Sequence, residues 1–238
     1  MVDHFTIKRA LYILSVALIT AGIVIAADVA MTLAWREPLS TVYGSIQQGH
    51  AADELEQLQR EYPTPAEVHD TAGHSRDVEA RARKLADNFA QRVETGKGIG
   101  RIKIPSIGLD IVLVQGTDTA SLQKGPGHYP DTAFPGQGKT IGIAGHRTTY
   151  LAPFRRINEI EDGDQIVLEM PYGTFTYTVE MHEIVDPSQV DIVDDVGYER
   201  LVLTACHPLY SAAQRWAVFA KLSDVSLFAG GQGSWQDP

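Results

Sequence analysis

The chain begins with a long apolar stretch. Residues 10–27 read ALYILSVALITAGIVIAA without a charge, and the apolar character continues past Asp28 to Trp35. A run of about 18 or more apolar residues is typical of a helix that spans a membrane. A cleaved signal peptide is the alternative, but its apolar core is usually only about 7 to 15 residues long. We therefore expect a retained single-pass anchor over residues 10–35.

The charges on the two sides of this stretch predict its orientation. Lys8 and Arg9 stand directly before it, whereas Arg36 follows it beside Glu37. Basic residues favour the cytoplasmic side of a membrane. Residues 1–9 should therefore lie in the cytoplasm, and the bulk of the chain should lie outside the plasma membrane.

Residues 36–98 are polar and rich in helix-forming side chains, which predicts an extracytoplasmic helical stalk or linker. One helix is expected over residues 53–62, ended by Pro63 and Pro65, and a second over residues 75–93. The second helix carries one apolar stripe, formed by Val78, Ala82, Leu85, Phe89 and Val93. The stripe should pack against the following domain or a neighbouring molecule. It is too short, at barely two heptads, to favour a coiled coil.

From Gly98 onwards the pattern changes to short strands separated by turns. Seven strands are predicted, at residues 100–105, 110–115, 139–146, 164–170, 174–181, 200–206 and 214–222. In residues 174–181 apolar side chains alternate with polar ones, as in a half-buried strand. With a short helix expected near residues 154–160, the pattern favours a closed or sandwiched antiparallel β domain over residues 99–225. Residues 226–238 are expected to form a flexible tail.

Composition narrows the classes of partner. The chain has 30 acidic and 20 basic residues, and the first 35 residues hold two of each, so the remainder keeps a charge of 18 minus 28, or −10. A nucleic-acid partner is disfavoured because the sequence offers no basic stripe for phosphate contacts. The single cysteine excludes an intramolecular disulfide. An unpaired thiol outside the cell is either buried, joined to another chain or used in chemistry.

That cysteine, Cys206, stands in LVLTACHPLY, at the end of a predicted strand and directly before His207. A cysteine nucleophile needs a base nearby. Adjacent side chains of a strand point to opposite faces, so His207 faces away from Cys206 if the strand continues through it. The base is therefore expected elsewhere in the chain. A buried structural cysteine is the alternative interpretation.

Two other histidines remain candidates for the base. His128 lies in the irregular stretch GPGHYP, and His146 follows a buried-looking strand in IAGHRTTY. Gly145 allows the backbone to turn or approach closely at that strand end, where reactive side chains are often presented. The pattern alone leaves both histidines open. A metal site formed by His128, His146, Cys206 and His207 is disfavoured, because these residues lack the close paired spacing of zinc ligands.

Arg215 is the candidate for stabilising an anion. It lies nine residues after Cys206, where the next predicted strand begins and pairs back toward the cysteine. A positive group beside a reacting carbonyl stabilises the oxyanion that forms there. An ordinary surface arginine is the alternative interpretation.

Four motifs in this order resemble one family. The stretch from about residue 101 to 222 contains RIKIPSIGLD, KGPGHYP, IAGHRTTY followed by PFRRI, and LTACHPLYSAAQRW. In these motifs the chain resembles the sortases, and specifically the class E sortases of Gram-positive actinobacteria. The N-terminal anchor and the polar segment after it also resemble those of membrane-bound sortases.

The resemblance implies an eight-stranded β-barrel that needs no cofactor. It also implies Cys206 as the nucleophile, His146 as the general acid and base, and Arg215 as the stabiliser of the transition state. The sequence departs from the family signature Thr-Leu-x-Thr-Cys, since Val202 and Ala205 stand where the two threonines fall. This departure puts in doubt any contribution of a hydroxyl at position 205.

The reaction that the resemblance implies is a transpeptidation. An exported protein with a C-terminal sorting signal, of LAXTG or LPXTG type, is cut between Thr and Gly through a thioester. It is then joined to an amine of a peptidoglycan precursor. Tyr129 is the candidate for contacting the second residue of the signal.

Two alternatives to this function stay open. The chain can be another exported cysteine enzyme of the cell wall, such as an L,D-transpeptidase or an NlpC/P60-type peptidase. It can also be a membrane-anchored binding module for sorting-signal peptides whose catalytic site has weakened. The Ala205 departure is the feature that favours the second alternative.

Overall fold

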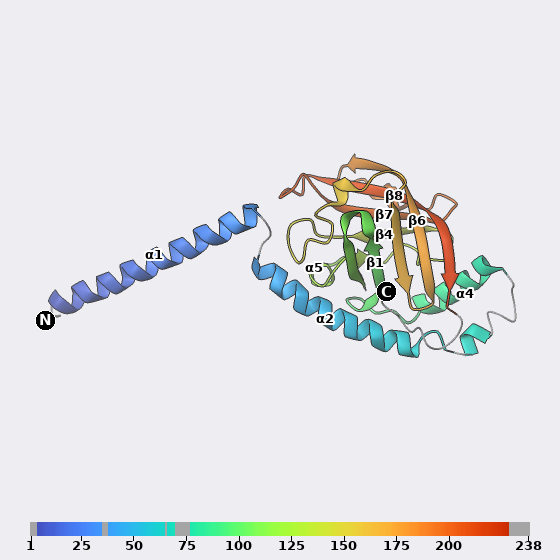
Figure 1. Cartoon of the computed structure of the whole chain (residues 1–238), viewed down its shortest axis with the longest axis horizontal. Coiled ribbons are helices and arrows are strands. Elements are labelled where there is room, and N and C mark those ends of the chain that lie inside the picture. Colours follow the sequence, from blue (N-terminus) through green and yellow to red (C-terminus); the bar gives the residue numbers. More distant parts are fainter. Residues whose placement is uncertain (1–3, 35–37, 65, 70–76, 229–238) are drawn as a thin grey trace.

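A computed structural model describes residues 4–34, 38–64, 66–69 and 77–228 of the chain (Figure 1). Of the tail expected at the C-terminus, residues 229–238 lie outside this description. The last strand continues to Leu227, two residues beyond the end of the predicted domain.

Eight strands close into a barrel in the order β1-β2-β3-β4-β7-β8-β6-β5. Their bounds are β1 Gly98–Ile104, β2 Leu109–Gln115, β3 Gly127–His128, β4 Thr140–Ala144, β5 Gln165–Met170, β6 Gly173–Val185, β7 Arg200–His207 and β8 Gln214–Leu227. The predicted eight-stranded barrel is confirmed. Seven of its strands match predicted ones, whereas β3 has only two residues and lies in the stretch read as irregular.

The prediction of a purely antiparallel domain is wrong for two pairs of strands. β2 pairs with β3, and β4 with β7, in parallel. Parallel neighbours need a long crossover connection, and here the chain between β4 and β7 supplies it with the β5–β6 hairpin. Short-range turn signals therefore could not reveal these two pairings.

The barrel is closed around a core of alternating inward side chains. Phe175, Tyr177 and Val179 of β6 are buried, and the residues between them point outward. The Tyr177 hydroxyl donates to the Glu199 carboxylate at 2.7 Å. The same carboxylate accepts backbone N–H bonds from Gly136 at 3.0 Å, so it fastens the β3–β4 connection to the barrel. Burial raises the pKa of Glu199.

Short helices fill the connections between strands. They are η1 Pro105–Ile107, α5 Thr119–Leu122, η2 Ile157–Glu159 and η3 Val190–Val193. α5 begins where the Asp118 side chain accepts the Ala120 and Ser121 N–H groups. The helix predicted near residues 154–160 is confirmed only as the single turn η2.

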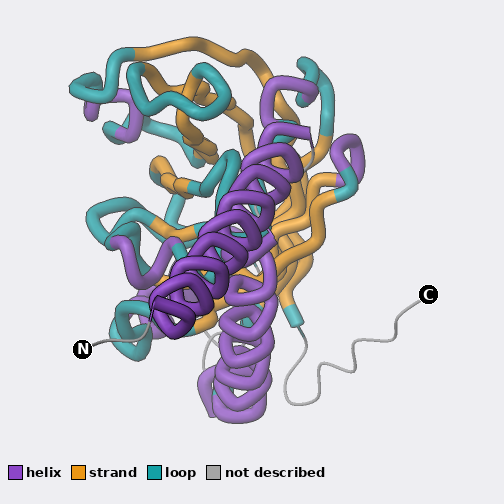
Figure 2. The backbone as a smooth tube through the Cα atoms, turned by 90° about the vertical axis from the view of Figure 1, so that its left-hand side faces the viewer, coloured by secondary structure: helices purple, strands orange, loops and turns teal. Residues whose placement is uncertain are grey.

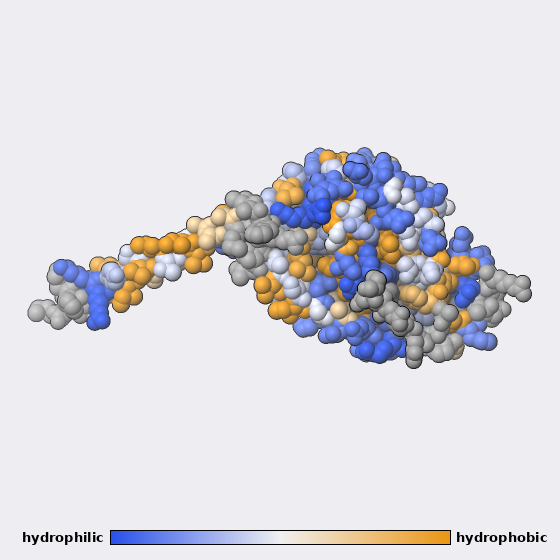
Figure 3. Space-filling view, in the orientation of Figure 1, coloured by the Kyte–Doolittle hydropathy of each residue, from blue (hydrophilic) through white to orange (hydrophobic). Residues whose placement is uncertain are grey.

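Helix α1, His4–Ala34, projects from the barrel (Figure 1). Its segment Lys8–Ala30 has a mean hydropathy of 2.4, and none of it is buried against the domain. Figure 3 shows apolar side chains along the length of this helix. Exposed apolar surface of this extent is what a membrane-spanning helix presents to lipid, so α1 is a candidate membrane span.

Helix α2, Pro38–Glu61, is much longer than the helix predicted over residues 53–62. It runs along the outside of the barrel below the strands in Figure 1, and Figure 2 shows the long helices on the near side of the strands. Ala51 and Leu55 are buried against Val112 and Val114 of β2. The second half of this helix is thus stabilised by apolar contact with the barrel.

Helix α4, Val78–Ala90, begins at Asp77, whose side chain accepts the Glu79 N–H. Three members of the predicted stripe, Ala82, Leu85 and Phe89, are buried in the main core. Because the stripe packs on the barrel of the same chain, the helix covers one face of the domain.

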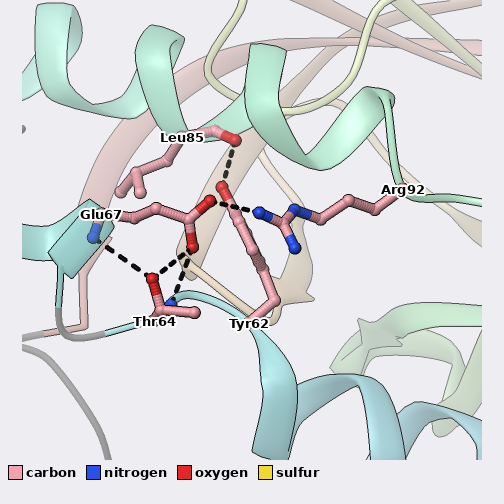
Figure 4. A network of polar contacts seen from close by, with 5 residues as sticks. All are labelled: Tyr62, Thr64, Glu67, Leu85 and Arg92. Carbon is pink, nitrogen blue, oxygen red and sulfur yellow. Dashed lines mark hydrogen bonds and ion pairs between the residues drawn. The ribbon is translucent and has the colours of Figure 1, made fainter.

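A polar network joins the end of α2 to α4 (Figure 4). The buried Tyr62 hydroxyl donates to the Leu85 carbonyl, and Arg92 forms an ion pair with Glu67 at 2.6 Å. The Glu67 carboxylate also accepts the Thr64 backbone N–H at 2.9 Å. These bonds hold the turn after α2 against α4.

Replacing Phe89 by alanine should destabilise the whole domain. Its ring is fully buried, 5.6 Å from Tyr62, 5.4 Å from Phe134 and 5.2 Å from Tyr172, measured between ring centroids. We expect Phe89→Ala to lower the free energy of unfolding by about 3 to 5 kcal/mol in urea titrations of the segment after α1. The control Val78→Ala, on the same helix but exposed, should change it by less than about 0.5 kcal/mol. Equal effects would contradict the packing of α4 on the barrel.

Candidate active site

Cys206 lies on β7 and Arg215 on the neighbouring strand β8, and His146 follows two residues after the end of β4 on the other side of β7. In the parallel β4–β7 pair the last partners are Ala144 and Thr204; Cys206 follows Thr204 by two residues along β7, and His146 follows Ala144 by two residues in the loop after β4. In the antiparallel β7–β8 pair Cys206 is directly opposite Arg215. Directly opposite residues of antiparallel strands project from the same face, with Cβ atoms about 4.5 to 5.5 Å apart.

The Cys206 side chain points to the outer face of the barrel. Strand β7 extends through His207, so its side chains alternate between faces to its end. Leu201 and Leu203 are buried in the barrel core, whereas Val202 belongs to a separate cluster outside it. Cys206 shares the outer face with Val202, and its partly exposed side chain is the only thiol in the chain.

The departure at Ala205 lies on the opposite face from the cysteine. Ala205 is buried in the barrel core, 3% exposed, and pairs with Trp216 of β8. A hydroxyl at this position would therefore point into the core. The neighbouring Thr204 supplies a hydroxyl on the outer face that Cys206 shares.

Tyr129 lies on this outer wall. Its hydroxyl is 2.9 Å from the Thr204 hydroxyl oxygen. A Cβ at Gly142 would stand 2.6 Å from the Tyr129 ring, so the glycine leaves room for the ring to lie on β4. The structure thus places Tyr129 against Thr204, two residues before Cys206 on the same face of β7.

His146 is half-buried, two residues after the end of β4. Its Nε2 is buried and has no hydrogen-bond partner among the described residues. Its ring lies 5.2 Å from the Tyr150 ring, measured between centroids. Burial lowers the pKa of His146, which favours the neutral imidazole that can accept a proton.

Gly145 fixes the path of the chain into His146. A Cβ at this position would stand 2.4 Å from the Phe154 ring, so a larger residue would push the loop away. The Phe154 N–H donates to the His146 carbonyl at 3.0 Å and closes the loop behind the histidine. This is the close approach that the glycine before His146 predicted.

Arg147 is a site residue that the sequence did not single out. It is 5% exposed, and its guanidinium donates to the Cys206 carbonyl at 3.3 Å and to Nδ1 of His207 at 3.2 Å. It also donates to the Asn158 side-chain oxygen. A guanidinium only donates, so Nδ1 of His207 accepts this bond. The arginine directly after His146 in GHRTTY was the available signal.

Burial lowers the pKa of Arg147, and the positive charge of Arg155 lowers it further, while Cys206 opposes both effects. The group remains a cation at neutral pH, since an ordinary arginine titrates above about 12.

Arg215 is bonded to the chain around it. Its guanidinium donates to the carbonyls of Ala212 at 2.9 Å and Gln214 at 3.0 Å. These bonds hold the side chain at the start of β8, where Arg215 is directly opposite Cys206. A carbonyl acceptor is easily exchanged for a stronger one, because bonds to an anion are about twice as strong.

His128, the other candidate for the base, is engaged elsewhere. Its ring is 1% exposed, stacked on Phe134 at 4.4 Å between centroids. Nδ1 is 3.0 Å from the Gln115 side-chain oxygen and Nε2 is 2.8 Å from the Ala133 carbonyl. Burial lowers the pKa of His128 to about 4. Both nitrogens are occupied, so this histidine suits neither proton transfer at Cys206 nor metal ligation.

Comparison with known proteins decides the family. A family model described as the Sortase domain matches residues 102–223, more than half of the 238 residues. The chain belongs to the sortase family. The matched range contains His146, Cys206 and Arg215.

Curated relatives agree with this sortase assignment. Sortase D of Bacillus subtilis is 39% identical over 132 residues, which cover 54% of this chain and 65% of the relative. Sortase SrtE1 of Streptomyces coelicolor is 30% identical over 173 residues, which cover 66% of this chain and 48% of the relative. This sortase chain thus matches less than two thirds of the length of either relative.

Solved sortases share its barrel. Sortase E from Streptomyces avermitilis has a TM-score of 0.52 at 32% identity, covering 59% of this chain and 97% of that chain. Sortase E1 from Streptomyces coelicolor, solved with a tripeptide in its active site, has a TM-score of 0.54 at 29% identity, covering 58% and 96%.

Acid should destabilise this sortase through His128. Because burial holds its pKa at about 4, the unfolded chain binds the proton between pH about 6.5 and about 4 and the folded chain does not. The free energy of unfolding should therefore fall, by about 3 kcal/mol, as the pH is lowered through this window. Urea titrations of wild type, His128→Asn and the exposed control His50→Asn measure this. The dependence of the unfolding free energy on pH should weaken in His128→Asn but not in His50→Asn. An unchanged pH dependence in His128→Asn would contradict the role of His128.

Proposed function

We propose that the chain is a membrane-anchored, extracytoplasmic sortase of the class E type. It cleaves an LAXTG or LPXTG sorting signal between Thr and Gly and joins the protein to a cell-wall amine. The observation that supports the proposal is that, within the matched sortase domain, Cys206 pairs directly with Arg215 and His146 follows the end of β4, the strand that pairs with β7. Nucleophile, base and cation are the three groups that acyl transfer from a peptide requires.

In the acylation step the proton of Cys206 passes to His146, and the thiolate attacks the Thr carbonyl carbon. Arg215 exchanges its carbonyl partners for the developing oxyanion. The C–N bond to Gly breaks as His146 gives its proton to the leaving amine. The product is a thioester between Thr and Cys206, with the Gly fragment released.

The second step reverses the proton path. The amine of a peptidoglycan precursor attacks the thioester carbonyl while His146 accepts its proton. The C–S bond then breaks, and the proton returns to the sulfur of Cys206. Burial of His146 supports this role in both steps, because a neutral imidazole is ready to accept a proton.

Tyr129 is proposed to contact the second residue of the signal. Its ring lies over Gly142 and its hydroxyl meets Thr204, two residues before the nucleophile. A peptide whose Thr carbonyl reaches Cys206 extends along this wall. The class E assignment rests on the Streptomyces relatives, and the 39% identity to Sortase D makes the choice of signal a matter for direct measurement.

Helix α1 is proposed to hold this enzyme in the plasma membrane, with Lys8 and Arg9 in the cytoplasm and the barrel outside. Its partners are then exported proteins that carry a sorting signal. The binding-module alternative loses its main support, because Ala205 faces the core rather than the outer wall where Cys206 lies.

An acyl-enzyme on Cys206 is the direct test. The full chain in detergent is incubated with Leu-Ala-x-Thr-Gly and Leu-Pro-x-Thr-Gly peptides and analysed by intact mass spectrometry. We expect an adduct equal to the peptide acyl group, absent in Cys206→Ala and faster with the Leu-Ala peptide. Peptide binding without an adduct at any pH would favour the binding module. Equal rates with both peptides would remove only the class E preference.

The two histidines around the cysteine should differ sharply. We expect His146→Ala to lower the acylation rate by about 10²- to 10⁴-fold, since proton transfer is lost. His207→Ala should lower it by less than about tenfold, because His207 faces Arg147 rather than the thiol. Arg215→Ala should cost about 10²- to 10³-fold. A larger loss for His207→Ala than for His146→Ala would contradict the proposed roles.

A further inference from the structure

The first turns of α2 contact the loop that follows His146. The Tyr150 N–H donates to the Ser40 hydroxyl oxygen at 3.1 Å, and the Tyr43 ring meets the Tyr150 ring edge-on at 6.2 Å between centroids. A Cβ at Gly44 would stand 3.1 Å from the Leu151 side chain and 3.2 Å from the Tyr150 backbone. The glycine thus lets the helix rest directly on the loop.

The loop needs such support because of its backbone conformation. Tyr150, Leu151 and Ala152 have φ angles of 49°, 67° and 45°. Three consecutive residues with side chains in the left-handed region are disfavoured by their own Cβ atoms. A conformation of this kind persists where its surroundings hold it. Ala152 is buried in the domain on one side, and α2 contacts Tyr150 on the other.

Tyr150 stands between this helix and the histidine. Its ring lies 5.2 Å from His146 and 6.2 Å from Tyr43, both between centroids. The buried Nε2 of His146 has no hydrogen-bond partner among the described residues, so packing rather than a hydrogen bond at Nε2 orients that edge of the ring. A shift of Tyr150 would therefore change both the position and the burial of His146.

The rest of α2 is held on the barrel by its own contacts, independently of the loop after His146. The Gln48 side chain bonds the Val112 N–H and carbonyl, each at 3.0 Å. The Ala51 carbonyl packs closely on Gly98: a Cβ at position 98 would stand only 2.1 Å from the carbonyl oxygen. The start of the helix follows α1 after three residues. Helix α2, which begins three residues after the end of α1 in the sequence, thus contacts both the barrel and the loop of His146.

We propose that the first two turns of α2 position His146 through Tyr150, so that the acylation chemistry depends on the helix next to the membrane anchor. The inference rests on the proposed function, since it takes His146 as the acid and base. Tyr150, Ser40, Tyr43 and Gly44 act as positioning residues in it. Support of the fold alone is the competing explanation, and it predicts loss of stability without a specific effect on His146.

Two glycines of α2 form a matched pair for the test. Gly44 touches the loop, whereas a Cβ at Gly49 meets nothing within 4 Å. In the full chain in detergent, Gly44→Val should lower the acylation rate constant by about tenfold or more and leave the peptide KM within about twofold. Gly49→Val, with the same change of residue on the same helix, should stay within about twofold of wild type. Ser40→Ala, which removes one bond, should show a smaller loss and serves if Gly44→Val does not fold.

Ring NMR titration of His146 gives a readout that does not need activity. Its signal is assigned with His146→Gln in histidine-labelled full chain. The titratable groups on the neighbouring elements are Tyr43 on α2, Arg147 and Tyr150 in the loop, Cys206 on β7 and Arg215 on β8. We expect the pKa of His146 to rise toward that of a solvated histidine in Gly44→Val and Ser40→Ala, but not in Gly49→Val, because the ring gains contact with water.

The outcomes separate the two proposals. Acylation rates and His146 titrations that are the same in Gly44→Val and Gly49→Val would overturn the positioning role, whether both match wild type or both fall. An absence of acyl-enzyme in wild type would overturn the proposed function alone, since the titration still decides whether α2 controls the environment of His146.

Discussion

The parallel pairing of β4 with β7 is the constraint on which the site depends. Five consecutive residues of β4 pair with residues of β7, from Thr140 opposite Arg200 to Ala144 opposite Thr204. A shift by one residue would turn every side chain of one strand to the other face. Ile141, Ile143, Leu201 and Leu203 fill the core from these strands, so burial of their side chains fixes the register. The same register sets the end of β4, two residues before His146, opposite Thr204, two residues before Cys206.

Hydrogen bonds to the ring nitrogens distinguish His146 from the other two histidines considered for the site, His128 and His207. His128 and His207 both have ring nitrogens engaged, the first by Gln115 and Ala133 and the second by Arg147. Among the described residues, Nε2 of His146 has no such partner. Buried polar groups without a partner are rare because they cost free energy, and they often occur where chemistry takes place. The difference between the histidines is thus one of hydrogen bonding as well as position.

Helices α2 and α4 pack on the barrel and share its core. Phe89 of α4 and Tyr62 at the end of α2 pack on Tyr172 of the main core. Gln48 satisfies the backbone of β2, which links α2 to the barrel by polar as well as apolar contacts. Since α2 starts three residues after α1, the candidate membrane span is joined to the domain by a short connection and a packed helix.

The sequence by itself determined the features that depend on local pattern. The apolar run predicted α1, the stripe at three- and four-residue spacing predicted the buried face of α4, and alternation along residues 200–207 assigned His207 to the face opposite Cys206. Seven strands and the approach at Gly145 also follow from neighbouring residues. The resemblance of the motifs added the barrel and the roles of the three site residues.

Only the tertiary structure decided what depends on contacts between distant segments. The two parallel pairings and β3 escaped prediction because their partners lie far apart in the chain. The first half of α2 lacks a clear apolar stripe, and its contacts with Val112 and Tyr150 hold it against the barrel. Arg147 reads as an ordinary polar residue until the fold buries it against Cys206 and His207. The local sequence pattern therefore predicts to which face of a strand or helix a side chain points, whereas packing between distant segments decides which residues that side chain contacts.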